Sequence, residues 1–347
     1  MNAQHNAAAA PAPTPEMILT QMAFGALVTQ ALYVVAKLGV ADLLAGRPQS
    51  VARLAAETRT HEQALYRVLR SLAGAGVFEE VEPRVFGLTP VGEALRTDAP
   101  NSMRSGLIFM GEEWHWRVWA DMLYSVRTGK PAWGHVHGGE VFDYFAVNPA
   151  QAEIFNRAMT DMSATTAPAV VEAYDFSGIG TIADIAGGHG YLLSQVLKAN
   201  PNARGILFDV QPVIEGAGQL LEREGVADRV EKVAGDFFAR VPAAADVYMM
   251  KHIIHDWDDE RAVMILRNIN EAMKRDGRVL LIEIVVPEGN EPHLSKFMDL
   301  EMLASPGGVE RTAKEYRDLL ASAGLRLTRI VPTKSPFSII EAVRDGS

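Results

Sequence analysis

The sequence predicts an α/β protein: a doubly wound, mostly parallel sheet in the C-terminal half follows a mostly helical N-terminal domain. Three observations support this fold class. From residue 176 onward, short apolar runs alternate with stretches of helical length, which is typical of strand–helix–strand units. The first two runs, Thr181–Ile185 and Gly205–Asp209, enclose a glycine-rich turn. Before residue 100, apolar residues recur mainly at helical spacing.

Composition narrows the class of protein. The formal net charge is −10, which disfavours general binding to nucleic acid or to an anionic membrane. The chain has no cysteine, which excludes disulfides, zinc–thiolate sites and thiol nucleophiles. Apolar residues make up 48% of the chain, as in soluble globular proteins. The lack of cysteine fits a cytoplasmic location, which we expect.

The N-terminal part of the chain has two distinctive features. Residues 1–15 are rich in Ala and Pro and are expected to be a disordered tail. Residues 17–36 carry no charge and are long enough to cross a membrane. However, Thr and Gln residues interrupt this stretch and no basic cluster flanks it, so we expect a helix buried at a subunit interface.

Residues 16–100 are expected to form one domain of helices followed by a hairpin. We predict one helix capped by Ser50 and another capped by Thr60. The hairpin strands would be Val77–Val81 and Val85–Leu88. Two helices and a hairpin form a winged-helix pattern, which occurs in DNA-binding and in dimerisation modules. Because acids and bases nearly balance here, with no basic stripe, dimerisation or packing is favoured.

Residues 101–175 are expected to form further helices rich in aromatic side chains and methionines. Ordinary core is one interpretation, and walls for a flat apolar ligand are the other. Residues 176–347 would form the sheet, with later strands Val230–Ala234, Val247–Lys251, Val279–Ile284, Leu325–Val331 and Phe337–Ala342. Only five residues join the last two strands, so these two should be antiparallel to each other.

The glycine-rich turn after the first strand indicates which cofactor binds. A dinucleotide site needs G-x-G-x-x-G, but Leu193 occupies the place of the third glycine, and no G-K-[ST] of a P-loop follows. Asp209 can accept hydrogen bonds from ribose hydroxyls, and Asp184 suits a cationic ligand. After the third strand, Asp236 can accept from an adenine amino group, with a helix cap as its alternative role, and Phe237 can cover the ring. S-adenosylmethionine, which has no phosphate, fits best.

The polar segment after the fourth strand is expected to carry the chemistry, because ligands bind at the carboxyl ends of parallel strands. In KHIIHDWDD, His255 is the candidate base that takes a proton from a phenol-like acceptor, and His252 is the weaker candidate. A structural histidine, or a metal site shared with the acids that follow, are the alternatives. Glu283 or Glu310 could orient the base, because a buried acid needs a partner.

Five ordered motifs, DIAGGHG, FDVQPVI, GDFF, KHIIHDWDD and GGVERT, resemble the S-adenosylmethionine-dependent small-molecule O-methyltransferases of plant caffeate type and of bacterial secondary metabolism. The resemblance spans about residues 16 to 343. It implies a Rossmann-like methyltransferase sheet, a winged-helix dimerisation domain, a homodimer, and methylation of a phenolic or polycyclic aromatic hydroxyl. N-methylation, or a hydroxylase or decarboxylase on the same fold, remains open, as does a winged-helix regulator that senses S-adenosylmethionine.

The predicted site joins the residue-based hypotheses to what the resemblance implies. The catalytic residues would be His255, Glu283 and Glu310. The cofactor-binding residues would be Asp184, Gly187, Gly188, Asp209, Asp236, Phe237, Lys251 and Trp257. The acceptor would be lined by Phe155, Met159, Met162, Asp256 and Met302, with no metal. The chain departs from the family pattern at Ala186, where a third glycine is common, and at His189, whose role is open.

Overall fold

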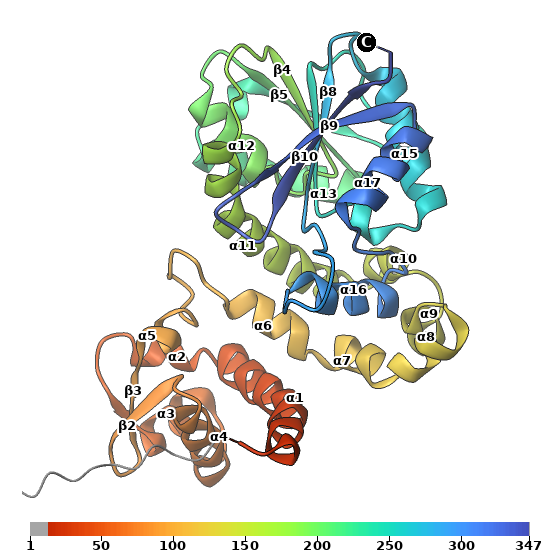
Figure 1. Cartoon of the computed structure of the whole chain (residues 1–347). Coiled ribbons are helices and arrows are strands. Elements are labelled where there is room, and N and C mark those ends of the chain that lie inside the picture. The colour runs from red at the N-terminus through yellow and green to blue at the C-terminus, as the bar shows by residue number, and fades with distance from the viewer. Residues whose placement is uncertain (1–12, 347) are drawn as a thin grey trace, which may run out of the picture. The chain divides into compact units, whose positions relative to one another are not determined.

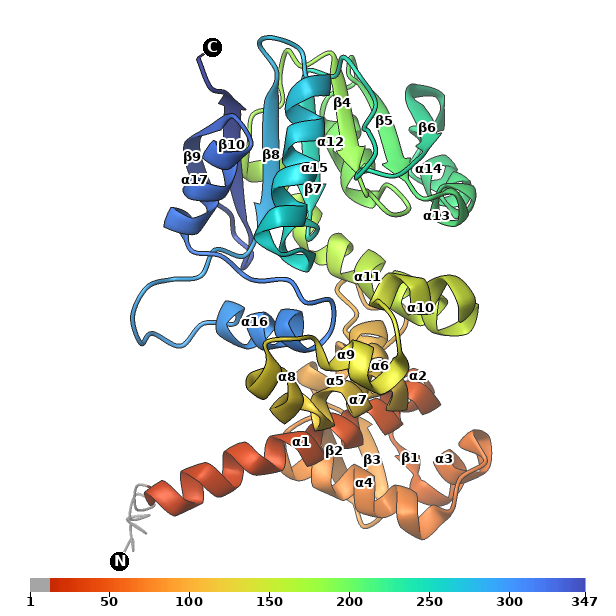
Figure 2. The same cartoon turned by 90° about the vertical axis from the view of Figure 1, so that its right-hand side faces the viewer.

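The structure, a computed structural model, describes residues 13–346 (Figures 1 and 2). Most of the predicted tail, residues 1–12, lies outside the described residues. Contacts within the chain group it into two compact units, Met1–Glu112 and Glu113–Ser347. The predicted boundaries at residues 100 and 175 stay predictions.

The first unit contains helices around a small antiparallel sheet of order β1-β3-β2. Its elements are α1 Pro15–Leu38, α2 Val40–Leu44, β1 Gln49–Ser50, α3 Val51–Thr58, α4 Glu62–Gly74, β2 Phe78–Glu82, β3 Val85–Leu88, α5 Pro90–Glu93 and α6 Arg104–Gly111. The predicted hairpin is confirmed as β2 and β3, which pair antiparallel. Leu54, Leu69 and Phe86 are fully buried and anchor α3, α4 and β3 in one core.

The two helix caps predicted in this unit have different outcomes. Ser50 caps α3 as predicted, because its hydroxyl accepts a backbone N–H at 3.3 Å. The prediction of Thr60 as the cap of α4 is wrong. His61 caps the helix instead, with Nδ1 accepting from the N–H of Ala64 at 3.3 Å, while the Thr60 hydroxyl lies 2.9 Å from that of Thr58. An imidazole nitrogen can thus replace a hydroxyl oxygen as the acceptor at a helix start.

Helix α1 leaves most of its apolar side chains uncovered in the single chain. Leu19, Met22 and Leu27 are each more than 60% exposed. The helix is long enough to cross a membrane, and its most apolar 18-residue stretch has a mean hydropathy of 1.6. Only 6% of that stretch is buried. A single helix of this kind near the N-terminus is weak support for a membrane span. Its exposed apolar face is what the sequence leads us to expect of a helix covered by a second subunit.

The second unit is built on a seven-stranded sheet of order β6-β5-β4-β7-β8-β10-β9. The strands are β4 Thr181–Ile185, β5 Arg204–Asp209, β6 Val230–Ala234, β7 Val247–Lys251, β8 Arg278–Glu283, β9 Leu325–Pro332 and β10 Ser338–Arg344. The first five are parallel, and β10 runs antiparallel to both β8 and β9. The predicted doubly wound sheet with an antiparallel end is therefore confirmed.

Helices cover both faces of this sheet. The helices of the second unit are α7 Glu113–Ala120, α8 Met122–Thr128, α9 Ala132–His137, α10 Val141–Val147, α11 Pro149–Ala173, α12 Tyr191–Ala199, α13 Gln211–Gly216, α14 Gly218–Arg223, α15 Asp259–Ala272, α16 Ser295–Ala304 and α17 Ala313–Ser322, with short 3-10 turns η1 Ala227–Arg229 and η2 Ile254–Asp256. One buried cluster joins the sheet to α15 and α17, and another joins it to α11 and α12. Both views place α10, α11 and α16 at the carboxyl ends of the parallel strands (Figures 1 and 2). This arrangement leaves the strand ends and these helices to enclose a ligand.

Candidate active site

The turn after β4 has the shape of a nucleoside cradle. A side chain on Gly187 would place its Cβ 2.6 Å from the carboxylate of Asp184, so only glycine fits. Gly188 has a φ of +60° with open space beside it, and its N–H donates to Asp209 Oδ2 at 2.8 Å. The second oxygen of Asp209 accepts the N–H of Val210 at 2.7 Å. The backbone therefore fixes the Asp209 carboxylate at the tip of β5, where remaining lone pairs can accept hydroxyl groups.

Asp184, which is buried, and Lys251, which is partly buried, interact electrostatically at this end of the sheet. Burial raises the pKa of Asp184 to about 7, and Asp184 Oδ2 has no hydrogen-bond partner among the described residues. Burial likewise lowers the pKa of Lys251 to about 8, while Glu283 and Asp184 partly restore it. A buried carboxylate oxygen without a donor destabilises the protein unless a ligand supplies one. An ammonium group on a ligand would supply such a donor.

The turn after β6 and the start of α15 bring aromatic rings together. Asp236 closes a local turn by accepting the N–H of Phe238 at 2.8 Å, and no helix follows, so its alternative role as a helix cap is wrong. Phe237 and Phe238 lie edge-on to the ring of Trp257, with centroids 5.9 and 4.8 Å away. His189 of the glycine turn packs against α13, where a Cβ on Gly216 would lie 3.1 Å from its Nε2.

His255 lies in η2, directly after β7, and it is 3% exposed. Its Nδ1 lies 2.7 Å from Glu310 Oε1, a hydrogen bond between two buried groups. Its Nε2 lies 3.5 Å from Asp256 Oδ1. Burial disfavours the charged imidazolium, but the nearby carboxylates Glu283, Asp256 and Glu310 outweigh burial and raise the pKa of His255 to about 10. The ring is thus held at Nδ1 and has a strong affinity for a proton.

Glu283 acts on His255 through the backbone. Its Oε1 accepts the N–H groups of Ile253 and Ile254 at 3.2 and 3.0 Å, which are the residues that lead into η2. Burial raises the pKa of Glu283 to about 7, and the positive His255 lowers it in part. Of the two acids predicted to orient the base, Glu310 therefore bonds the ring, and Glu283 holds the turn that carries it.

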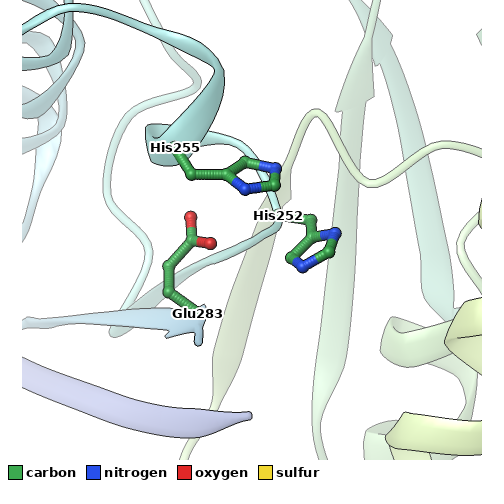
Figure 3. A group of neighbouring side chains, drawn as sticks. All are labelled: His252, His255 and Glu283. Carbon is green, nitrogen blue, oxygen red and sulfur yellow. The ribbon is translucent and has the colours of Figure 1, made fainter. Parts of the chain in front are cut away.

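His252, His255 and Glu283 form the group most suited to a metal ion among the described residues (Figure 3). One ligand atom from each lies within 4.8 Å of the others, and all three side chains are buried. However, Glu283 Oε1 already accepts two backbone N–H groups and His255 Nδ1 is bonded to Glu310. A metal would compete with these bonds, so we assign none, and the expected absence of a metal stays a prediction. The acids considered with them have other partners: Asp258 caps α15 and Asp259 pairs with Arg311.

Four of the five predicted acceptor residues lie on two helices at the same end of the sheet, and the fifth, Asp256, lies in η2. Phe155, Met159 and Met162 are half-buried on α11, and the ring of Phe155 stacks on Phe145 at 4.8 Å. Met302 is 6% exposed on α16. These positions agree with walls for an acceptor, but their role stays a prediction.

Several polar residues of this region were not predicted from the sequence. On α16, Glu301 accepts from Trp119 Nε1 at 2.6 Å and lies 2.9 Å from the Nε2 of His115, which is 1% exposed. Arg311, directly after Glu310, is 1% exposed and bonds the turn that carries His255. The only sign of Arg311 in the sequence is a charged residue in the GGVERT segment. Its bonding partners, Ile254 and Trp257, are distant in sequence.

The residues present fit S-adenosylmethionine. The Asp184 oxygen that has no partner among the described residues suits an ammonium group. At Gly187 the backbone lets a ligand approach closely, and Asp209 lies where ribose hydroxyls would bind. The glycine turn is not followed by the G-K-[ST] sequence with which a P-loop binds phosphate. Fold and site together define a transferase of the Rossmann-like class that uses a nucleoside cofactor.

Comparisons with known proteins agree with this class. The family model for the O-methyltransferase domain matches residues 119–326, and the one for the O-methyltransferase dimerisation domain matches residues 20–98. Phenazine O-methyltransferase PhzM of Lysobacter antibioticus is 48% identical, covering 94% of this chain and 95% of the relative. Mitomycin biosynthesis 6-O-methyltransferase of Streptomyces lavendulae is 41% identical, covering 92% of each.

A solved structure connects the cofactor to this fold. NcsB1, an O-methyltransferase from neocarzinostatin biosynthesis, was solved with S-adenosylmethionine and 2-hydroxy-5-methyl naphthoic acid. It is 32% identical with a TM-score of 0.81, covering 96% of this chain and all of that one. The chain belongs to the O-methyltransferase family and is an S-adenosylmethionine-dependent O-methyltransferase. The family, enzyme class and cofactor predicted from the sequence are therefore confirmed.

Proposed function

We propose that this enzyme methylates a hydroxyl group of a small planar aromatic molecule, with His255 as the general base. The observation that carries the proposal is the buried bond between His255 Nδ1 and Glu310, which commits one ring nitrogen and orients the other. The relatives named above act on phenazine, mitomycin and naphthoate compounds, all of which contain fused or substituted rings. The aromatic and methionine side chains of α11 and α16 suit such an acceptor.

The chain's own residues explain how a hydroxyl becomes a nucleophile. Neutral His255 takes the acceptor's proton at Nε2, while Glu310 holds the Nδ1–H and stabilises the resulting imidazolium. Phenols have a pKa near 10, close to that of His255, so proton transfer between them is nearly balanced. S-adenosylmethionine, when bound, supplies an electrophilic methyl group on a sulfonium. Alignment of the two bound reactants contributes much of the rate.

The remaining site residues have proposed roles that follow the same geometry. We infer cofactor contacts from Asp184, Gly187, Gly188, Asp209, Asp236, Phe237, Lys251 and Trp257. We infer acceptor contacts from Phe155, Met159, Met162, Asp256 and Met302. Support for Asp256 comes from its position 3.5 Å from the reactive nitrogen of His255. We also propose a cytoplasmic homodimer, supported by the dimerisation-domain match and by the exposed apolar face of α1.

The test is the His255→Ala variant, assayed against a panel of phenazine, naphthoate and benzoate phenols with a labelled methyl donor. We expect turnover to fall by about 10²–10⁴-fold, while the affinity for S-adenosylhomocysteine stays within about twofold. Mass and NMR analysis of the product identifies methylation at oxygen rather than nitrogen.

A matched control is His135→Ala. His135 also pairs with an acid, at 2.6 Å from Asp121, but its side chain is exposed. This variant should turn over like the wild type. Near-normal methylation by His255→Ala would refute the base assignment, whereas loss of both turnover and S-adenosylhomocysteine binding would show a folding defect instead of a catalytic one.

A further inference from the structure

The segment 308–311 docks directly on the turn that carries His255. The N–H of Val309 donates to the carbonyl oxygen of His255 at 2.8 Å. A Cβ on Gly308 would lie 1.9 Å from that same oxygen, so the two backbones are in the closest contact that glycine allows. The segment that supplies Glu310 is therefore held against the base by its backbone as well as by the Glu310 side chain.

Arg311 strengthens this contact from inside the protein. Its Nη1 donates to the carbonyl oxygen of Ile254 at 3.1 Å, and its Nη2 donates to that of Trp257 at 2.9 Å. These two carbonyls stand on either side of His255 in sequence. A planar guanidinium can serve both at once, whereas an ammonium group cannot span them in one plane. Arg311 thus fixes the two ends of η2 relative to the Glu310 backbone.

The positive charge of Arg311 has its counter-ion at the surface. Asp259 Oδ1 accepts from Nε and Nη2 of Arg311 at 3.0 and 2.8 Å. The Arg311 side chain is 2% exposed, whereas that of Asp259 is 78% exposed. The pair therefore connects the first turn of α15 to the buried turn of the base, and Asp259 can be changed without opening a cavity.

A second bond holds Glu310 from the other side. The N–H of Glu310 donates to Asp299 Oδ1 on α16 at 2.9 Å. With Arg311 next in sequence also fixed, the backbone of Glu310 cannot rotate freely. The 2.7 Å bond from its carboxylate to His255 Nδ1 thus depends on both neighbours. A shift of about 1 Å in such a constellation can lower a rate by about 10²-fold.

We propose that Arg311 is a positioning residue: by tying both ends of η2 to the segment 308–311, it sets the distance between Glu310 and the ring of His255. This inference rests on the proposed role of His255 as the base. Arg311 touches neither cofactor nor acceptor in the proposed mechanism, so its effect on the reaction is indirect.

The experiment compares Arg311→Lys with Asp259→Asn and with a control, Arg267→Gln. Arg267 lies on the same helix as Asp259 and donates to the carbonyl oxygen of Ser322 at 3.0 Å, in a solvent-exposed contact that involves neither η2 nor the segment 308–311. We expect Arg311→Lys to lower kcat by about 10–100-fold, with the acceptor KM and the S-adenosylhomocysteine affinity within about twofold. Asp259→Asn should lower kcat by about 2–5-fold, and the control should match the wild type.

Two further readouts separate positioning from simple stability. Arg311→Lys keeps the positive charge, so a longer contact between Glu310 and His255 should move the pH profile of kcat to lower pH. In histidine-labelled protein, the His255 Nδ1–H resonance should shift or be lost through exchange. Arg311→Met, which loses every donor, should be more impaired than Arg311→Lys if it folds.

The outcomes decide the proposal. If Arg311→Lys keeps the wild-type kcat and pH profile, Arg311 is not a positioning residue. If it loses kcat only in proportion to folded protein and S-adenosylhomocysteine binding, its role is purely structural and the proposal fails. If His255→Ala remains active, the proposed function fails, whereas the His255 resonance in Arg311→Lys still tests the effect of Arg311 on the ring.

Discussion

At the scale of single residues, the charges around His255 would set the pH range in which this proposed base can accept a proton. Three carboxylates lie near the imidazole, and together they raise its pKa to about 10 despite burial. A general base must be neutral to take a proton, so kcat/KM should rise with pH toward the pKa of His255 in the free enzyme. The same carboxylates that make the base strong therefore keep it protonated at neutral pH.

Removing one of these charges should make the base weaker and shift its titration. In Glu310→Gln, the amide oxygen can still accept from Nδ1–H, but the negative charge is lost. We expect the ascending limb of kcat/KM to move to lower pH, because the pKa of His255 falls toward 6.5, and the plateau to drop by about 10–100-fold.

The measurement is a pH profile of kcat/KM with an acceptor that carries a single phenolic hydroxyl and no other ionising group, used for both the wild type and the variant. Glu172→Gln is the control, because Glu172 is an exposed partner of Lys334. A Glu310→Gln profile that coincides with the wild-type limb would contradict the charge argument.

The backbone conformation of Ala186 has a consequence for stability. Ala186 has a φ of +54°, in the left-handed region that disfavours side chains. We expect Ala186→Gly to raise the free energy of unfolding by up to about 1 kcal/mol, since relief of strain outweighs the extra chain entropy of glycine.

Urea unfolding of Ala186→Gly checks this, with Ala262→Gly as the control. Ala262 is buried in helix α15, where glycine should instead lower the free energy of unfolding by about 1 kcal/mol. A loss of stability in both variants would show that the turn does not strain Ala186.

At the scale of elements, local patterns were sufficient to predict the sheet. Four of the five parallel strands are short, mainly apolar runs, so their length and composition defined them, whereas β6 contains Glu231 and Lys232. The antiparallel pairing of the last two strands followed from the length of their connection, because five residues are too few for a crossover between parallel strands. The cap of α4 was predicted wrongly because a histidine nitrogen took the role that sequence rules give to a neighbouring hydroxyl.

The site was only partly predictable for a physical reason. His255 and Glu283 stand out because they follow or end an apolar strand, and Glu310 because it lies in the GGVERT loop, but their separate tasks depend on which atoms meet. Glu283 lies beside His255 yet bonds backbone N–H groups, which no residue pattern specifies. Arg311 bonds carbonyl oxygens, and every residue has one, so the sequence contains no mark of its partners.

At the scale of the whole molecule, α1 is an apolar surface that a single chain leaves open. Its exposed residues include Leu19, Met22, Phe24 and Leu27, and the dimerisation-domain match begins within this helix at residue 20. Full burial of one such side chain stabilises an assembly by about 1.5–3 kcal/mol. A few of them covered by a second copy would suffice for a stable dimer.

We therefore expect Leu27→Glu to convert the proposed dimer to a monomer. The side chain is 64% exposed in the single chain, so the substitution should leave the fold intact, whereas a carboxylate buried in an interface without a partner costs several kcal/mol. Analytical ultracentrifugation at micromolar concentration, without detergent, measures the mass of both forms. Val91→Glu, at another exposed apolar residue of the same unit outside α1, is the control and should stay dimeric. A wild-type protein that sediments as a monomer, or that requires detergent to stay in solution, would contradict the assignment of α1 to a subunit interface. An unchanged dimer in Leu27→Glu would place the interface elsewhere.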